Sequence, residues 1–446
     1  MLLATMSPSL LFKAGLFAFF RVPVDPLMDQ SRQVVITGIG VVSPIGVGRE
    51  PFWSSLRESQ SGVTRLEFLA SSESPVDIGA SLKDFDGKQY IKPRKALKVM
   101  CREIQTACSA AALAVADSGL TQSDTDPERK GAVFGSQMLY GDINDYEDLF
   151  RGSSPDGEFN FEQFGESFPN RMYPLWMLKN LPNMAACHIA IAHDARGPNN
   201  SIVLGEVGSL VALDEAVRAI QRDVADVMIV GGTGTRLEIT GWIYRGALHL
   251  SQRNDQPAAA SRPFDADRDG MVNGEGAGAL ILESRQHAEQ RCAEILAVVH
   301  GFGSSFATKP SLKSRAIQNS IQNALKAAGA DASDLGHVNA HGLSTIENDR
   351  AEANAIREAL GDVSVTALKS QFGNLGAGGG AVELIGSVLA LQHREVPPTI
   401  NYETPDSSCP VNVIHGVSQT VTKPLAMKLN QSQTGQSVAL VIGVNE

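Results

Sequence analysis

The chain has 446 residues, enough for one large or two ordinary domains with a substantial buried core. Its 43% hydrophobic and 20% charged residues exclude a disordered or fibrous protein, and its net charge of −11 opposes binding to nucleic acid or anionic lipid. The five scattered cysteines form neither a CxxC pair nor a disulfide framework. We therefore expect reduced thiols, a cytoplasmic protein, and no metal or other cofactor.

The first 27 residues differ from the rest of the chain. An apolar run at 10–20 is too short to span a bilayer and is followed by no small-residue cleavage site. Met28 leads directly into a buried-strand pattern, so we interpret residues 1–27 as an N-terminal extension that need not be translated. A poor signal-like segment or an interfacial helix is the alternative.

From residue 32 onward the pattern is that of an α/β protein. The β-branched run at 34–42 predicts a strand buried on both faces, and the spacing over 100–116 predicts a helix. A strand at 201–204, an amphipathic helix at 209–222 and a buried strand at 225–230 follow. The apolar face of that second helix comprises Leu210, Leu213, Ala216 and Ile220.

The second part of the chain repeats this pattern. The sequence at 295–303 echoes the first strand, a helix is predicted at 315–328, and a strand ends within 338–342. We therefore predict two similar α/β halves, 32–290 and 291–446, produced by an internal duplication.

Six segments, in order, resemble the β-ketoacyl-ACP synthases of the type II elongating kind, which have the thiolase fold. The resemblance extends from Arg32 to the C-terminus. It implies two stacked βαβαβαβ halves, five α-β-α-β-α layers, a dimer, and an acyl carrier protein (ACP) as partner. The segments are RQVVITGIGVVSPIG, ADVMIVGG, LSQRND with AASRPFDADRDGMVNGEGAGALILE, VNAHGLST, LKSQFGNLGAGGGAVE and VPPTIN.

In this family a cysteine at a sharp strand-to-helix turn takes the acyl group from ACP. Two histidines stabilise charge on the thioester oxygen while malonyl-ACP loses CO2, and a lysine supports them. Here the register places Glu206 at the cysteine position, with no cysteine within fifteen residues. Acylating a carboxylate would form an anhydride at a cost of roughly 5 to 6 kcal/mol, so a long-lived acyl-enzyme is not expected. A structural role for Glu206, with its charge stabilised by the helix N-terminus, is an alternative of equal weight to a functional one.

The resemblance assigns three further positions near this turn. His341 is the first family histidine, Asn374 stands in place of the second, and Lys369 is the supporting lysine or a buried counter-charge. A histidine with an asparagine is the pairing of the initiating synthases and plant polyketide synthases, where decarboxylation persists. An ionised Glu206 beside His341 is expected to raise the pKa of that histidine and form a Glu⁻/His⁺ pair.

A third departure lies in the C-terminal loop. The family carries a GFGG turn whose phenylalanine gates the acyl pocket, and this chain has Gln433 near that position, with a one-residue shift as the alternative. With fewer glycines, the loop is expected to be stiffer and to lose an oxyanion-hole N–H.

Three hypotheses follow for the function. The first is a condensation-deficient partner subunit, similar to the chain-length factors that pair with a Cys-bearing ketosynthase in a heterodimer. The second is a malonyl-ACP decarboxylase. The third is an acyltransferase that works without an acyl-enzyme, with Glu206 as general base. Each requires acyl or malonyl phosphopantetheine on ACP, docked on a local basic patch near the pocket entrance, and either a homodimer or a heterodimer.

Overall fold

The computed structural model describes residues 32–69, 73–137 and 141–445. The predicted N-terminal extension, 1–27, lies outside the described residues.

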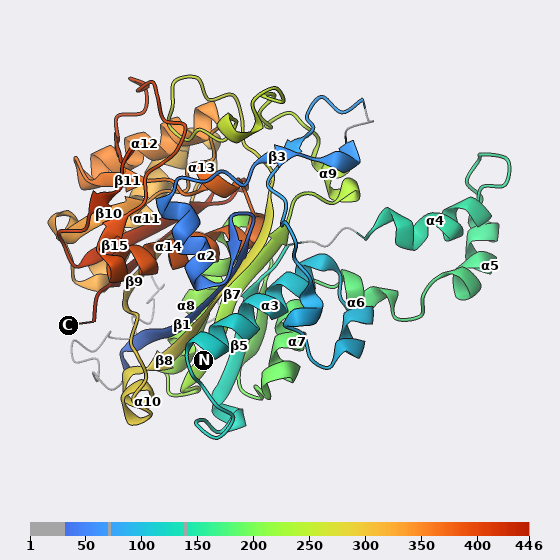
Figure 1. Ribbon diagram of the computed structural model, residues 1–446, viewed down its shortest axis with the longest axis horizontal. Helices are drawn as coiled ribbons and strands as arrows, with labels where there is room; N and C mark the ends of the chain where they lie inside the picture. Colours follow the sequence, from blue (N-terminus) through green and yellow to red (C-terminus); the bar gives the residue numbers. More distant parts are fainter. Residues whose placement is uncertain (1–31, 70–72, 138–140, 446) are drawn as a thin grey trace, which may run out of the picture.

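The first half of the chain builds a five-stranded mixed sheet (Figure 1). One strand runs against the other four, so its two pairings are antiparallel and the remaining two pairings are parallel. In spatial order the strands are β1 (Val34–Ser43), β8 (Glu275–Ser284), β7 (Val227–Thr235), β5 (Lys130–Gly135) and β6 (Asn199–Ile202).

The second half repeats the same order and the same strand directions, which confirms the predicted duplication. The equivalent strands are β9 (Ala297–Phe306), β16 (Gln436–Gly443), β15 (Leu425–Gln431), β10 (Leu335–Asn339) and β11 (Ser364–Thr366). β1 pairs with β9, with Val35 opposite Val298, and this short pairing joins the sheets of the two halves into one hydrogen-bonded sheet.

Helices cover both sheets and fill the space between them, which gives five layers. The outer face of the first sheet carries α3 (Arg102–Asp117) and α7 (Met184–His193). The central layer comprises α8 (Gly208–Gln221) and α14 (Gly379–His393), and the outer face of the second sheet carries α11 (Lys313–Ala328) and α12 (Ile346–Leu360).

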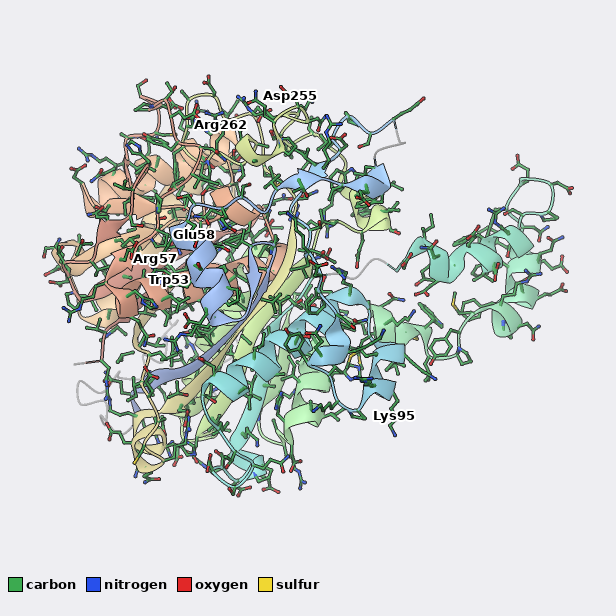
Figure 2. The ribbon with its side chains drawn as sticks, viewed as in Figure 1. Trp53, Arg57, Glu58, Lys95, Asp255 and Arg262 are labelled. Carbon is green, nitrogen blue, oxygen red and sulfur yellow. The ribbon has the colours of Figure 1, made fainter. Side chains whose placement is uncertain are left out.

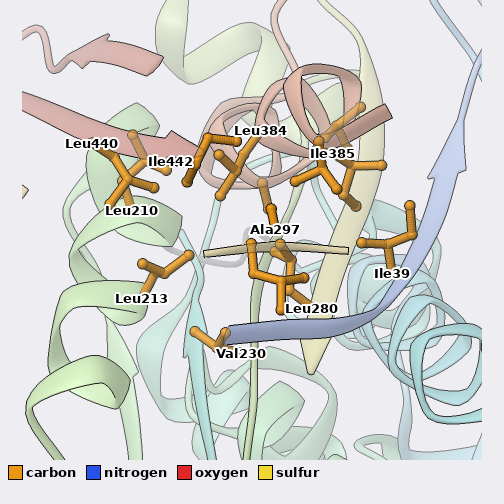
Figure 3. Close-up of a cluster of buried hydrophobic side chains, with 14 of the residues drawn as sticks. Ile39, Leu210, Leu213, Val230, Leu280, Ala297, Leu384, Ile385, Leu440 and Ile442 are labelled. Carbon is orange, nitrogen blue, oxygen red and sulfur yellow. The ribbon is translucent and has the colours of Figure 1, made fainter. Parts of the chain in front are cut away.

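The largest hydrophobic core lies around the central helices (Figure 3). Leu210 and Leu213 of α8 and Leu384 and Ile385 of α14 are almost completely buried between strands of both sheets. The predicted apolar face of α8 is confirmed, because Ala216 and Ile220 are buried as well.

The predicted strand at 225–230 is too short. β7 continues through 231–235, because its glycines allow a loop to lie directly on the strand. A Cβ at Gly232 would lie 2.4 Å from the Ala377 carbonyl oxygen, and a Cβ at Gly234 would lie 2.3 Å from that of Leu375. The glycines of β7 therefore mark a close-packing site, where the loop that contains Leu375 and Ala377 lies directly against the strand.

One segment leaves the layered body altogether. Residues 141–180, which we call the arm, form α4 (Ile143–Gly152), α5 (Phe161–Arg171) and α6 (Trp176–Asn180). Helices α4 and α5 project to one side, whereas α6 lies against the body beside α7 (Figure 1). No pattern in the sequence predicted this projection.

Candidate functional site

Glu206 lies in a single 3-10 turn between β6 and α8, the strand-to-helix turn that the sequence predicts. Gly205 allows the turn through its positive φ of 57°, and α8 begins at Gly208. The Glu206 residue is only 4% exposed, so its carboxyl group is surrounded by protein.

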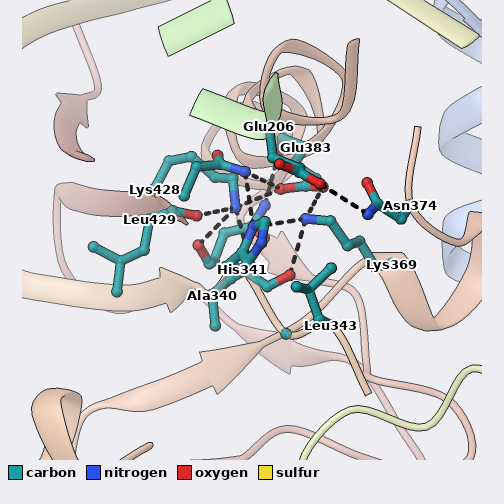
Figure 4. Close-up of polar contacts among 12 residues, drawn as sticks. Glu206, Ala340, His341, Leu343, Lys369, Asn374, Glu383, Lys428 and Leu429 are labelled. Atoms are coloured by element: carbon teal, nitrogen blue, oxygen red, sulfur yellow. Dashed lines mark hydrogen bonds and ion pairs between the residues drawn. The ribbon is translucent and has the colours of Figure 1, made fainter. Parts of the chain in front are cut away.

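Arg236 neutralises this buried carboxylate. Its Nη1 donates to Glu206 Oε1 at 2.8 Å, and both side chains are less than a tenth exposed. Its Nε donates to Asn273 Oδ1 at 3.1 Å, which orients the guanidinium. Asn374 Nδ2 also donates to Glu206 Oε1, at 3.3 Å (Figure 4). The sequence therefore placed Asn374 correctly beside Glu206 but missed the arginine.

The charge state of Glu206 follows from these contacts. Burial opposes ionisation, but Arg236, a backbone N–H and Asn374 outweigh it and lower the pKa of Glu206 below its ordinary value. Glu206 is consequently an ionised carboxylate at neutral pH.

His341 and Lys369 form the second part of the site. Lys369 Nζ donates to the His341 carbonyl oxygen at 2.9 Å and to its Nδ1 at 3.2 Å, and Asn430 Nδ2 donates to the same Nδ1 at 3.0 Å. Glu352 accepts the His341 backbone N–H at 2.7 Å and so fixes the end of β10. Because Nδ1 accepts, the ring proton is on Nε2.

Two buried lysines share one buried carboxylate next to His341 (Figure 4). Glu383 of α14 pairs with Lys369 through one oxygen and with Lys428 of β15 through the other, the latter at 2.5 Å. Lys428 Nζ also donates to three main-chain carbonyls, those of Asn339, Ala340 and Leu429. Burial lowers the pKa of Lys428 to about 8 in spite of Glu383. The counter-charge role proposed for Lys369 is therefore consistent with this geometry.

The expected Glu⁻/His⁺ pair does not form. Burial, Lys369 and Lys428 hold the pKa of His341 well below its ordinary value, so the ring is neutral. The carboxylate of Glu206, which was expected to stabilise the protonated ring, is paired with Arg236 instead. Within the described residues, His341 Nε2 is buried and has no hydrogen-bond partner.

Gln433 lies apart from this cluster. It is exposed in the turn between β15 and β16 and lines a cavity of about 540 Å³. Met271 lines the same cavity and contacts Asn374 Nδ2 through its sulfur at 3.5 Å, so one side chain separates the cavity from the buried site. The residues that line this cavity include Lys313 and His249 as well as Asp269 and Glu347.

Two charged residues of the site, Arg236 and Lys428, were not predicted, although their positions in the sequence indicate buried partners. Arg236 follows the apolar strand β7 at the edge where the neighbouring parallel strands also end, which is the edge that carries Glu206. Lys428 is the one charged residue of the buried strand β15, LAMKLNQ. A lone charge in either position indicates a buried partner.

The assembled site offers two N–H groups, His341 Nε2 and Asn374 Nδ2, near a paired carboxylate. Such donors can stabilise negative charge on an oxygen atom. No group of three or more His, Cys, Asp or Glu side chains in the described part of the chain is placed to hold a metal ion. Across 32–69, 73–137 and 141–445, no helix has the length and apolar character needed to cross a membrane.

Comparisons with known proteins agree with this architecture. The chain is 35% identical over 396 residues to the 3-oxoacyl-[acyl-carrier-protein] synthase 2 of Coxiella burnetii, covering 86% of this chain and 92% of that protein. It is 34% identical over 422 residues to the protein of the same name from Synechocystis, covering 92% and 98%.

Two solved structures cover 93% of this chain and all of their own, each with a TM-score of 0.81. They are the ishigamide ketosynthase/chain length factor, at 28% identity, and AntDE:AntF, a type II PKS acyl-carrier protein in complex with its ketosynthase bound to the hexaketide, at 29%. The beta-ketoacyl synthase N-terminal domain matches residues 31–288 and the C-terminal domain matches 292–403. The chain thus belongs to the β-ketoacyl synthase family, with the thiolase-like fold of ketosynthases and the 3-oxoacyl-ACP synthases of fatty acid and polyketide synthesis among its relatives.

Proposed function

We propose that this chain is a condensation-deficient partner subunit of a Cys-bearing ketosynthase, comparable to a chain-length factor. The observation that carries the proposal is the buried ion pair between Glu206 and Arg236 at the turn where the family resemblance expects the nucleophile.

Acyl transfer to Glu206 is chemically unfavourable. The reaction would break the thioester, release the pantetheine thiol and leave an anhydride on the carboxylate, at a cost of roughly 5 to 6 kcal/mol from the difference in leaving-group basicity. The lowered pKa of Glu206 widens that difference. Acylation would also remove the negative charge and leave Arg236 buried without its partner.

The same pairing argues against Glu206 as a general base. A base must have a pKa close to the working pH to accept a proton effectively. The carboxylate of Glu206 is shifted in the opposite direction and already accepts hydrogen bonds from Arg236 and Asn374. The acyltransferase hypothesis is therefore the weakest of the three.

A malonyl-ACP decarboxylase is the second candidate, and one observation favours it. His341 Nε2 is a buried donor with no partner among the described residues, and the Asn374 amide lies nearby, as needed to hold a thioester oxygen during CO2 loss. The ionised Glu206 opposes it, because it would repel both the malonyl carboxylate and the enolate.

Intact mass spectrometry distinguishes the candidates. The purified protein is incubated with malonyl-ACP and with acyl-ACP, and the masses of both carriers and of the protein are followed. We expect no acyl adduct on the protein and no CO2 loss from malonyl-ACP. The Glu206→Gln variant is compared with Glu294→Gln, an exposed position remote from the site.

Either activity would be informative. CO2 loss that disappears in a His341→Ala variant and persists in Glu294→Gln would overturn the partner proposal in favour of the decarboxylase. A stable acyl adduct abolished by Glu206→Gln would contradict the argument from leaving-group basicity.

A further inference from the structure

The ammonium group of Lys428 lies deep inside the protein. A lysine side chain usually keeps its charged end in water, as Lys95 does on the outside of the molecule (Figure 2). Lys428 is 0% exposed, and burying a charge costs free energy unless other polar atoms replace the water around it. None of the three candidate functions uses this group.

Four oxygen atoms surround Lys428 Nζ, and we call them the oxygen cage (Figure 4). They are Oε2 of Glu383 at 2.5 Å and the carbonyl oxygens of Leu429 at 2.6 Å, Ala340 at 3.0 Å and Asn339 at 3.2 Å. An ammonium group has only three N–H bonds, so the four oxygens cannot each accept a separate one. The arrangement therefore resembles the shell of carboxylate and carbonyl oxygens around a hard cation.

The fold assembles this cage from neighbouring elements. β10 and β15 are parallel partners with Asn339 opposite Lys428, and Glu383 comes from α14 in the central layer. Lys428 binds the carbonyls where β10 ends, and Lys369 binds the next carbonyl along the chain, that of His341. Three successive carbonyl groups are therefore bound by two ammonium groups, which fixes the main chain at the histidine.

The cage also has oxygen atoms that the lysine does not use. Oδ1 of Asn339 and Oδ1 of Asn430 are buried without a hydrogen-bond partner among the described residues, and the Asn430 amide donates to Glu383 at 3.5 Å. Carboxylate, carbonyl and amide oxygens are the ligands that hard cations prefer. The one carboxylate of the cage is shared with Lys369, so the charge suits a monovalent cation better than a divalent one.

We propose that Lys428 is a built-in monovalent cation: its ammonium group occupies an oxygen cage that would otherwise bind a free ion of similar size, such as ammonium or potassium. Lys428 is a positioning residue, since it acts on His341 through the main chain. The inference goes beyond the proposed function, because it applies to a partner subunit and to a decarboxylase alike.

Chemical rescue tests this role. In a Lys428→Ala variant the cage loses its cation and gains the space of the missing side chain, whereas in Lys428→Met an apolar chain of similar length fills that space. At equal ionic strength, Lys428→Ala should unfold at a higher temperature in ammonium or potassium chloride than in tetramethylammonium chloride, whose cation is too large for the cage. With a hundredfold excess of ion over its dissociation constant, the rise should be about 3 °C.

Three controls separate ion binding from a general effect of salt. The unchanged protein, Lys428→Met and Lys326→Ala, which removes an exposed lysine of α11, should unfold at the same temperature in all three salts. The absence of any difference in Lys428→Ala, or an equal difference in Lys428→Met, would overturn the proposal.

The position of His341 gives a second readout on the same variant. Added ammonium should return the NMR signal of the His341 ring in Lys428→Ala toward its place in the unchanged protein. A general loss of packing would not be repaired by a small ion. A ring signal that stays displaced at saturating ammonium would contradict the positioning role.

A third measurement covers the case in which Lys428→Ala does not fold. The pKa of about 8 keeps Lys428 charged at pH 7, and an ammonium group enclosed by oxygen atoms exchanges its protons slowly with water. The unchanged protein, labelled with nitrogen-15, should therefore give a Lys428 NH3⁺ signal that is lost in Lys428→Met and retained in Lys326→Met. The absence of that signal would show a neutral or solvent-accessible amine and refute the proposal. Since none of these readouts follows carrier masses, their failure is distinct from a failure of the proposed function.

Discussion

Removing Arg236 should expose the energetic cost of the buried Glu206 carboxylate. In an Arg236→Met variant the side chain keeps much of its length, but Glu206 retains only Asn374 and a backbone N–H as hydrogen-bond donors. Breaking a buried ion pair by removing one partner costs about 3 to 5 kcal/mol, because the remaining charge stays buried. The double variant Glu206→Gln, Arg236→Met removes both charges and should recover most of that loss.

The size of the expected thermal shift follows from the chain length. With about 2.1 cal/mol/K of unfolding entropy per residue, a chain of this size loses roughly 1 °C in its unfolding midpoint for each kcal/mol. Arg236→Met should therefore unfold about 3 to 5 °C lower than the unchanged protein at pH 8. Arg218→Met provides a matched control, because Arg218 pairs with Asp214 on the surface of α8 and should change stability by less than about 1 kcal/mol.

The contribution of Glu206 to stability should depend on pH with opposite signs in the unchanged protein and in the Arg236→Met variant. In the unchanged protein the pKa of Glu206 is lowered, so its contribution is present above 4.5 and is lost as pH falls through the folded-state pKa. Without Arg236, burial should raise that pKa above 4.5. The contribution is then complete below 4.5 and is lost as pH rises through the raised value.

Differential scanning fluorimetry between pH 4.5 and 8.5, at one fixed protein concentration, measures both effects. The reasoning predicts that Arg236→Met loses more stability at pH 8 than at pH 5, and that the double variant shows no such trend. If Arg236→Met is as stable as the double variant at pH 8, Glu206 is not a buried charge held by Arg236, and the main support for the proposed function is lost.

The other predictions concern the second half of the site and the loop. Lys428 has a folded pKa of about 8, so between pH 8 and 10.5 its deprotonation should raise stability by at most about 1.4 kcal/mol per pH unit. A Lys428→Met variant, compared by urea unfolding across that range, should lose this slope. The His341 imidazole should remain neutral in NMR titrations from pH 8 to 6, and an imidazolium signal at pH 6 would show that Lys369 and Lys428 do not govern its charge. Gln433→Ala should change the free energy of unfolding by less than about 0.5 kcal/mol, because Gln433 is exposed. A larger loss of stability would show that this side chain is packed in the core.

Much of the fold could be predicted from local patterns. The apolar spacing of α8 and the β-branched residues of β1 are properties of short stretches, so periodicity found them. The similarity between β1 and β9 predicted the duplication, which the matching strand order of the two sheets confirms. The end of β7 was missed because Gly232 reads locally as a turn, whereas in the fold it makes room for the loop that carries Asn374.

The sequence by itself also determined which residues stand at the motif positions: Glu206, His341, Asn374 and Lys369. It could not determine their charges. The tertiary structure pairs Glu206 with Arg236, thirty residues later in the chain, because their strands end at the same sheet edge. It also places Lys428 near His341 through the pairing of β10 with β15. Whether a buried group is ionised depends on every charge within a few ångströms, and only the folded chain decides which residues those are.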